Sequence, residues 1–153
     1  MIEMTNDSMK RMQRYLGLLR MCMGMTQAEF GEELGVSRQQ IWNLEHGYNQ
    51  MTRMHFSAIN WLYYCREGLL DMNIEDRMKR PTMARFVYDF VIMSPEMFND
   101  AQEEKYIISL LYIKAPLYMR VKNTDGREAI EKDFFRELMK RGYDDFYDDM
   151  KKI

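Results

Sequence analysis

The chain lacks several features that mark large classes of proteins. Its 153 residues include only three prolines and eight glycines, and the longest largely apolar run is Tyr106–Ile113. A membrane-spanning helix needs about 18 or more apolar residues in a row, and the sequence does not open on a basic segment followed by an apolar one. We therefore expect a cytoplasmic protein that has no membrane partner.

Cysteine and histidine are also scarce, with two of each. Cys22 and Cys65 fit a reducing compartment and predict free, buried thiols. Neither has the spacing of a zinc site with His46 or His55, and the sequence has no glycine-rich phosphate loop or nucleophile signature. We therefore expect no metal, no cofactor, no catalytic residues and no enzyme activity.

An excess of basic charge is missing as well. Lys and Arg number 22 against 24 Asp and Glu, a formal net charge of −2, whereas a bulk nucleic-acid binder is strongly basic. Contact with phosphates would have to come from local clusters such as Lys10, Arg11 and Arg14, for which a solvated helix face is the more common role.

Hydrophobic residues, which can form a core, are abundant. They make up 46% of the chain, and 17 residues are methionines, whose flexible side chains suit irregular packing.

The segment 25–47, MTQAEFGEELGVSRQQIWNLEHG, fits two short helices joined by a tight turn. A helix from about Gln27 to Leu34 must stop abruptly, and Gly35 tolerates the positive φ that is needed there. Ser37 can cap the next helix by accepting hydrogen bonds from its first free amides. Gly31 lies one helical turn before Gly35, where two crossing helices need a small residue. This spacing predicts a helix-turn-helix.

The side chains of this segment divide into an apolar and a polar set. Helical spacing relates the apolar residues, which we expect to be buried: Phe30, Leu34, Val36, Ile41 and Leu44. Amides outnumber charges in the polar set on the second helix, which comprises Arg38, Gln39, Gln40, Trp42 and Asn43. Gln and Asn pair with the N6/N7 edge of adenine and Arg with the O6/N7 edge of guanine, and each pair discriminates by about 1–3 kcal/mol. We therefore expect the polar face to read bases.

This pattern resembles the Cro/C1 (XRE) family of phage and bacterial repressors, over a range from about Tyr15 to about Tyr64. The resemblance implies a lambda-repressor-like domain of four or five helices that binds double-stranded DNA. By the same resemblance, base reading falls to Arg38, Gln39 and Asn43, with Gln40 and Trp42 beside them. Contacts to the DNA backbone fall to Gln27, Ser37, Asn49, Thr52 and Arg53, with Tyr48 beside them. A structural ion pair between Arg20 and Glu45 is also implied.

The segment departs from the family pattern in three ways. Gly31 stands where alanine is more usual, and Trp42 is bulky for a helix that enters a groove, so packing on sugar or on a partner is an alternative role for it. Between Thr26 and Gly47, Arg38 is the one basic residue against four glutamates. Because Lys and Arg supply most of the non-specific affinity for DNA, one copy should bind weakly, and we expect a homodimer.

Helical periodicity continues on both sides of this segment. Asp7 or Ser8 can cap a first helix that reaches about Met23, and its apolar stripe comprises Met9, Met12, Leu16, Leu19 and Met23. A helix from about Met54 to Cys65, ended by Gly68, offers apolar residues that can close the bundle: Phe56, Ile59, Trp61, Leu62 and Tyr63. We assign 1–68 to a helix-turn-helix DNA-binding domain, the polar stretch 69–81 to a linker and 82–153 to a C-terminal region.

The C-terminal region reads as mostly helical. Thr82 can cap an amphipathic helix, Ser94 with Pro95 signals another start, and Asp100 with Glu103 has capping-box spacing. The segment 106–121 is ambiguous, because a buried strand and a short β-hairpin fit its apolar pattern as well as a helix does. Asp125 and Glu128 can cap a last helix that ends at Gly142. The acidic stretch 143–150 is typical of a solvated tail, with docking on a partner as the alternative.

Two functions fit these observations. The first is a sequence-specific transcriptional regulator, a repressor that binds its operator as a homodimer. The alternative is a protein-interaction factor, such as an antitoxin or a phage-encoded inhibitor, whose helix-turn-helix domain regulates its own gene. In both cases residues 82–153 would supply dimerisation or bind a protein partner. A stripe in this region fits plain core and interface alike: Phe86, Phe90, Phe134 and Leu138.

Overall fold

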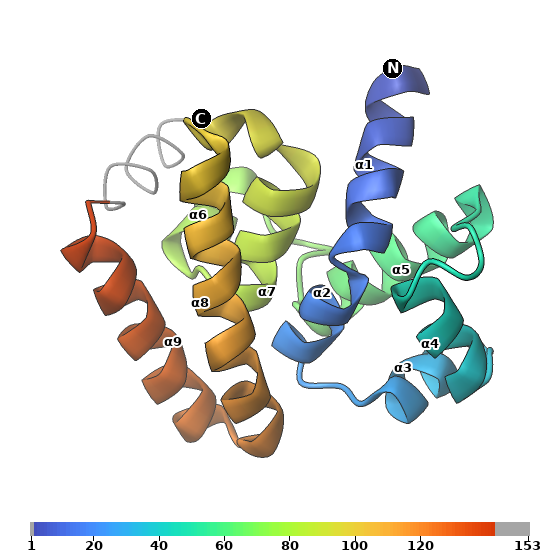
Figure 1. Ribbon diagram of the computed structural model, residues 1–153. Helices are drawn as coiled ribbons and strands as arrows, with labels where there is room; N and C mark the ends of the chain where they lie inside the picture. The colour runs from blue at the N-terminus through green and yellow to red at the C-terminus, as the bar shows by residue number, and fades with distance from the viewer. Residues whose placement is uncertain (1, 143–153) are drawn as a thin grey trace.

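The computed structural model describes residues 2–142, with side chains from residue 7 onward except that of Met78. These residues form nine α-helices, one π-helix and one 3₁₀ helix and contain no strand. The first half comprises α1 (Ile2–Arg14), α2 (Leu16–Cys22), α3 (Gln27–Leu34), α4 (Arg38–Glu45) and α5 (Arg53–Arg66). The second comprises α6 (Ile74–Lys79), α7 (Met83–Phe86), η1 (Val87–Met93), η2 (Pro95–Met97), α8 (Ala101–Arg120) and α9 (Thr124–Lys140), as Figure 1 shows. The predicted mainly helical fold is confirmed.

Three helices of the first half begin at a capping box. The cap residues each accept a hydrogen bond from the amide three positions ahead: Thr26, Ser37 and Thr52. The side chains at these third positions return a bond to the cap's own amide: Glu29, Gln40 and His55. Two otherwise free amides are satisfied at each start. α3 ends at Gly35, whose φ of 74° is left-handed, so the helices predicted from Gln27 and from Ser37 are both present.

The first helix differs from its prediction at its start and near its middle. α1 begins at Ile2, so Asp7 and Ser8 lie inside it and the predicted cap is wrong. No proline or glycine precedes Asp7, so nothing stops the helix from extending past it. The backbone leaves helical geometry at Tyr15 (φ −107°, ψ 18°), which separates α1 from α2. Four residues of the predicted apolar stripe are nevertheless buried, namely Met12, Leu16, Leu19 and Met23, and Met9 is half-buried.

The centre of the second half is a buried helical segment. Thr82 caps α7, as predicted, by accepting a hydrogen bond from the amide of Arg85. α7 runs directly into the π-helix η1, and side chains on all sides of the combined segment are buried. The pattern predicts an amphipathic helix, and this prediction is wrong. The segment is a core element. Its two charged side chains have partners: Arg85 donates to the Glu67 carbonyl at 2.8 Å, and Asp89 pairs with Arg77.

α8 resolves the ambiguous segment in favour of a helix. Asp100 caps it by accepting from the amide of Glu103, and it continues through Pro116 for 20 residues to Arg120. The strand and β-hairpin alternative is wrong. The residues that decide are buried at helical spacing along one face: Ile107, Leu111, Ala115 and Tyr118. An alternation of two could not have buried this set on one side.

The cap of α9 lies two residues earlier than predicted. Asn123, not Asp125, is the N-cap, and its side-chain oxygen accepts from the amide of Gly126 at 2.7 Å. The helix ends before Gly142, as predicted. The candidate interface stripe is part of the chain's own core, since four side chains are 2% exposed or less: Phe86, Phe90, Phe134 and Leu138. The predicted acidic tail, 143–150, lies outside the described residues.

One hydrophobic core runs through both halves. α2 packs against α8 and also against α7 and η1, so that it lies between the two groups of helices in Figure 1. The predicted linker 69–81 contains α6, and Arg77 of α6 forms an ion pair with Asp89 of η1. The division into two domains stays a prediction. None of the helices described between residues 2 and 142 is both long and apolar enough to cross a bilayer.

Candidate nucleic-acid interface

α3 and α4 cross at very close range because Gly31 has no side chain. A Cβ placed on Gly31 would lie 2.6 Å from the carbonyl oxygen of Val36, in the turn between the helices. Three of the five predicted apolar residues are buried beneath this crossing: Phe30, Ile41 and Leu44. The other two, Leu34 and Val36, are half-buried and pack against the same core. The crossing therefore fixes the direction in which α4 leaves the turn.

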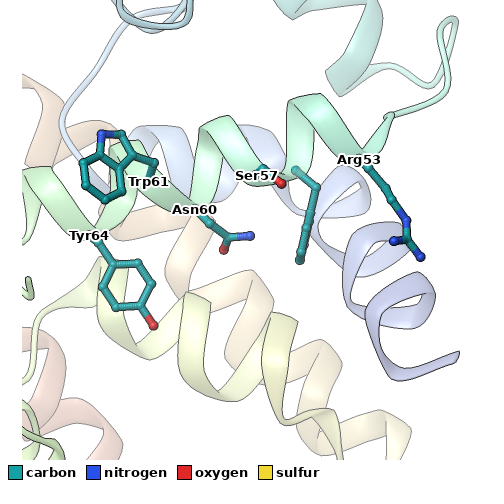
Figure 2. A pocket seen from close by; sticks show the side chains of 6 residues that line it. Arg53, Ser57, Asn60, Trp61 and Tyr64 are labelled. Carbon is teal, nitrogen blue, oxygen red and sulfur yellow. The ribbon is translucent and has the colours of Figure 1, made fainter. Parts of the chain in front are cut away.

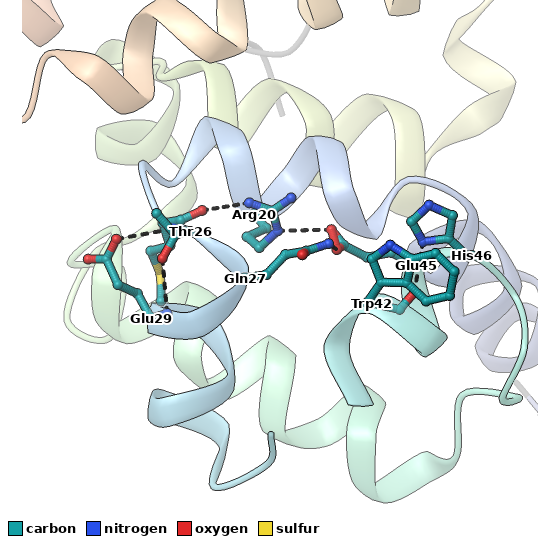
Figure 3. Close-up of polar contacts among 8 residues, drawn as sticks. Arg20, Thr26, Gln27, Glu29, Trp42, Glu45 and His46 are labelled. Atoms are coloured by element: carbon teal, nitrogen blue, oxygen red, sulfur yellow. Dashed lines mark hydrogen bonds and ion pairs between the residues drawn. The ribbon is translucent and has the colours of Figure 1, made fainter. Parts of the chain in front are cut away.

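A buried polar network holds α4 from behind, as Figure 3 shows. Arg20 Nε donates to Glu45 Oε1 at 2.8 Å, and Arg20 Nη1 donates to the carbonyl of Met25 at 2.8 Å. The second carboxylate oxygen of Glu45 accepts from Gln27 Nε2 at 2.9 Å. The two charged side chains are 9% and 6% exposed. The ion pair implied between Arg20 and Glu45 is thus present, and it joins α2, α3 and α4.

Gly17 makes room for this network. A Cβ at Gly17 would lie 2.9 Å from Glu45 Oε1. That carboxylate is pinned by Arg20 and Gln27, so it has little freedom to move aside. Sequence reasoning missed Gly17, because its importance depends on a contact with a residue 28 positions later in the chain, for which a local pattern carries no signal.

The outer face of α4 is polar and open to solvent. Arg38, Gln39 and Gln40 are exposed, and Asn43 is half-buried. Gln39 Nε2 donates to Asn43 Oδ1 at 3.0 Å, one helical turn away. Gln40 uses its side-chain oxygen to accept from the Ser37 amide at 2.8 Å, so it supports the start of the helix. The residues expected to read bases therefore share one accessible face.

Gln27 lies beside this face rather than apart from it. Together with three residues of α4 it lines a shallow hollow of about 560 Å³: Arg38, Gln39 and Trp42. The hollow is bounded by the first turn of α3 on one side and the first two turns of α4 on the other. It brings a residue implied in backbone contact next to two implied in base reading.

Trp42 packs within its own chain. Its ring stacks on His46, with the centroids 3.9 Å apart, and on Tyr48, with the centroids 5.4 Å apart. His46 Nδ1 also lies 2.8 Å from the Trp42 carbonyl oxygen. These contacts fix the orientation of the indole and explain how so large a side chain fits on the outer part of α4.

The loop after α4 is tied down by one residue of α1. Gln13 Nε2 donates to the carbonyls of Leu44 and Asn49, at 3.1 and 2.6 Å, and Gln13 Oε1 accepts from the Met51 amide at 2.9 Å. Nothing in the sequence near Gln13 indicates this role. The loop that carries Asn49 is therefore held in place by the hydrogen bonds of Gln13.

The two other residues implied in backbone contact at this loop lie where α5 begins. Thr52 is the N-cap of α5, and Arg53 is its first residue. Both are exposed, as is Ser37 at the start of α4. The implied backbone contacts thus fall into two groups, one at the starts of α3 and α4 and one at the loop and the start of α5.

Charge around the face is mostly negative. Glu32 and Glu33 are exposed on α3. A hydrogen bond from the Thr26 amide, and then Lys122, lower the pKa of Glu29. In the cluster Lys10, Arg11 and Arg14, Arg11 serves the core: it donates to the Val91 carbonyl at 2.6 Å and to Glu104 at 2.8 Å. Lys10 and Arg14 are exposed.

A second hollow, of about 400 Å³, runs along α5, as Figure 2 shows. Its lining residues follow one face of that helix: Arg53, Phe56, Ser57, Asn60, Trp61 and Tyr64. Trp61 is 63% exposed, so its predicted place in the core is wrong. Asn60 accepts a hydrogen bond from Tyr88 at 2.6 Å, which fixes the floor of the hollow to the second half.

The two thiols differ in environment. Cys22 is buried and Cys65 is exposed, so the prediction of two buried thiols is wrong for Cys65. The buried side of α5 carries Ile59 and Tyr63, and Cys65 lies on the opposite side of the helix. Among residues 2–142, no group of three or more His, Cys, Asp or Glu side chains is placed to hold a metal ion.

Exposed apolar side chains gather on α8 as well. Three of them lie within two turns of that helix: Tyr112, Ile113 and Leu117. The expectation that residues 82–153 dimerise or bind a protein partner stays a prediction.

In comparisons with known proteins, no protein-family model matches the chain, and neither a curated protein nor a solved structure gives a significant match.

Proposed function

We propose that this protein is a sequence-specific transcriptional regulator that binds double-stranded DNA through α4. The observation that carries the proposal is a rigid, polar, exposed helix face on a buried support. Arg38 and Gln39 are exposed, while Glu45 at the far end of the same helix is 6% exposed and ion-paired. An interface that reads bases needs polar tips held in fixed positions. α4 has such tips at one end and an anchor at the other.

In this proposal α4 enters the major groove, which admits an α-helix. Arg38 pairs with the O6/N7 edge of a guanine, and Gln39 and Asn43 offer amides to the N6/N7 edge of an adenine. The hydrogen bond between Gln39 and Asn43 orients one amide by means of the other. Each good bidentate pair contributes about 1–3 kcal/mol of discrimination between bases.

Contacts to the phosphates set the position of the helix and carry no sequence information. The starts of α3 and α4 supply Gln27 and Ser37, and the loop before α5 supplies Asn49, Thr52 and Arg53. Gln27 Nε2 is committed to Glu45, so its contribution comes from its backbone amide in the first turn of α3. Helix N-termini favour anions in this way.

We further propose that the protein acts as a homodimer and represses by occupying its operator. The helix pair has one basic residue between Thr26 and Gly47, and few phosphate contacts mean weak binding. Two copies on half-sites one helical turn apart, about 34–36 Å, would combine their affinities. The operator is then expected to be palindromic.

Selection of bound duplexes from a random pool, at two ionic strengths, tests this function. Enrichment of palindromic sequences by the full chain is the expected result. Asn43→Ala should lose the base preference at one position of each half-site and about 1–3 kcal/mol of affinity. Asn99→Ala is the matched control, because Asn99 is exposed and lies on the second half. Failure of the full chain to enrich any sequence at either ionic strength would overturn the proposal.

A further inference from the structure

The corner between α8 and α9 lies against the first turn of α3. Lys122, in this corner, donates from Nζ to both carboxylate oxygens of Glu29, at 3.1 and 3.2 Å. The corner and the helix pair therefore share one edge of the molecule, the lower edge in the view of Figure 1. Glu29 lies two residues after Gln27, at the end of α3 that borders the hollow on α4.

This contact supplies basic charge where the helix pair lacks it. Lys122 is 59% exposed and lies beside the acidic α3. Arg120 is exposed in the last turn of α8, two residues earlier. The nearest opposing charge on the corner itself is Asp125, exposed in the first turn of α9. The corner thus carries two exposed cations, and one of them, Lys122, contacts α3.

The ion pair between Lys122 and Glu29 is easily redirected. Both side chains are largely exposed, 59% and 44%, and exposed pairs contribute little to stability because water screens them. A lysine is a compact charge on a flexible stem. Lys122 can therefore turn from Glu29 to a nearby phosphate at little cost. Paired with Glu29 it reduces the repulsion between α3 and DNA, and paired with a phosphate it adds an attraction to the backbone.

We propose that Arg120 and Lys122 form a phosphate-contacting corner on the second half of the chain. It would bind the sugar-phosphate backbone of the duplex that flanks the half-site read by α4. This inference rests on the proposed function and deepens it, because it assigns part of the DNA interface to residues outside the helix-turn-helix. The corner adds affinity and positions the protein, and it carries no base preference.

The salt dependence of binding tests the corner, with the full chain and a duplex that it selects. Each phosphate contact contributes about 0.9 to the slope of log K against log salt concentration. Lys122→Gln and Arg120→Gln should each lower that slope by up to about 0.9 and leave the ranking of duplexes unchanged. Lys79→Gln is the control, because Lys79 also forms an exposed pair with a glutamate, Glu75, and α6 lies away from the lower edge in Figure 1. It should leave the slope unchanged.

Glu29→Gln provides the opposite test. Glutamine keeps a side-chain oxygen that can accept from the Thr26 amide, so α3 retains its capping box. Removing the carboxylate should tighten binding, because it frees Lys122 and removes a repulsive charge. Circular dichroism of each variant checks that the fold is intact.

The outcomes separate the two proposals. If the chain selects a duplex but the slope is the same in wild type, Lys122→Gln and Arg120→Gln, the corner is wrong and the proposed function stands. If the chain selects no duplex, both are wrong. If the slope falls by the same amount in Lys122→Gln, Arg120→Gln and the control Lys79→Gln, the corner is also wrong, because the change would then reflect net charge alone.

Discussion

The carbonyl oxygen of Val36 occupies the space that a side chain at Gly31 would need, at 2.6 Å from the position of its Cβ. α3 and α4 are joined by only three residues between Leu34 and Arg38, so the backbone has little freedom to move away. Alanine at this position would improve helix propensity by about 1 kcal/mol, but it would also force the two helices apart.

We therefore expect Gly31→Ala to destabilise the protein by about 1–3 kcal/mol, the range for overpacking in a tight core. Urea unfolding measures the change. Glu33→Ala, at an exposed position of the same helix, should stay within about 0.5 kcal/mol of wild type. A Gly31→Ala protein that is more stable than wild type would mean that the two helices are further apart than the structure has them.

Glu45→Ala should cost about 3–5 kcal/mol, because it leaves the guanidinium of Arg20 buried without a partner. The double variant Arg20→Met with Glu45→Leu should cost less than the two single changes together, since no charge is then left unpaired. A double-mutant cycle by chemical unfolding measures this coupling. Glu75→Ala breaks an exposed pair with Lys79 and should cost less than about 1 kcal/mol. Equal costs for the buried and the exposed pair would contradict the structure.

One thiol should react quickly in the folded protein and the other only after unfolding. Cys65 is exposed, whereas Cys22 is buried, and burial also raises the pKa of the Cys22 thiol. Since the thiolate is the reactive form, a thiol reagent should label one equivalent fast and a second in denaturant. Cys65→Ser should abolish the fast equivalent. Two fast equivalents in the native wild type would show that Cys22 is accessible.

The stability of the fold should fall as pH rises from about 4 to about 6. Burial raises the pKa of Asp89 to about 6, although Arg77 beside it acts in the opposite direction. The unfolded chain has an ordinary aspartate pKa near 3.9, so in this window the folded state binds more protons than the unfolded state. Stability therefore decreases as the folded protein loses that proton. Burial also raises the pKa values of Glu67 and Glu131, which act in the same sense.

Asp89→Asn should remove part of this pH dependence. Urea unfolding at pH 4, 5 and 6 measures it. Between pH 4 and pH 6 the free energy of unfolding should change by up to about 3 kcal/mol more in wild type than in the variant, since each pKa unit corresponds to about 1.36 kcal/mol. Asp71→Asn is the control, because Asp71 is exposed. An unchanged pH profile in Asp89→Asn would mean that Asp89 titrates in the folded protein as it does in the unfolded chain.

The helix pair was predictable because its determinants are local. Gly35 and Ser37 act within four residues of themselves, so their roles can be recognised from spacing alone. The closeness of Gly31 to the turn follows from the same short segment. The ion pair between Arg20 and Glu45 was available only through the family resemblance, because 25 residues separate the two.

The second half was harder to predict because its determinants lie far apart in the sequence. The run 106–121 becomes a helix because α8 buries Leu111 and Ala115 against a core that α2 helps to build. Single residues of the first half were missed as well. Trp61 has the spacing of a core residue but lies on the outer side of α5. Gln13 and Lys122 reach partners 31 or more positions away, and no local pattern reveals such contacts.

α2 serves both halves within two helical turns. Arg20 of α2 pairs with Glu45 and so supports the helix proposed to read DNA, and α2 also packs against α8. A local opening of α8 would remove the packing that holds α2, and α2 carries the arginine that supports α4, so the opening of the two helices should be coupled. Amide hydrogens of α4 and α8 are then expected to exchange with solvent together, and whatever loosens the far side of the molecule would weaken the support behind Arg38 and Gln39.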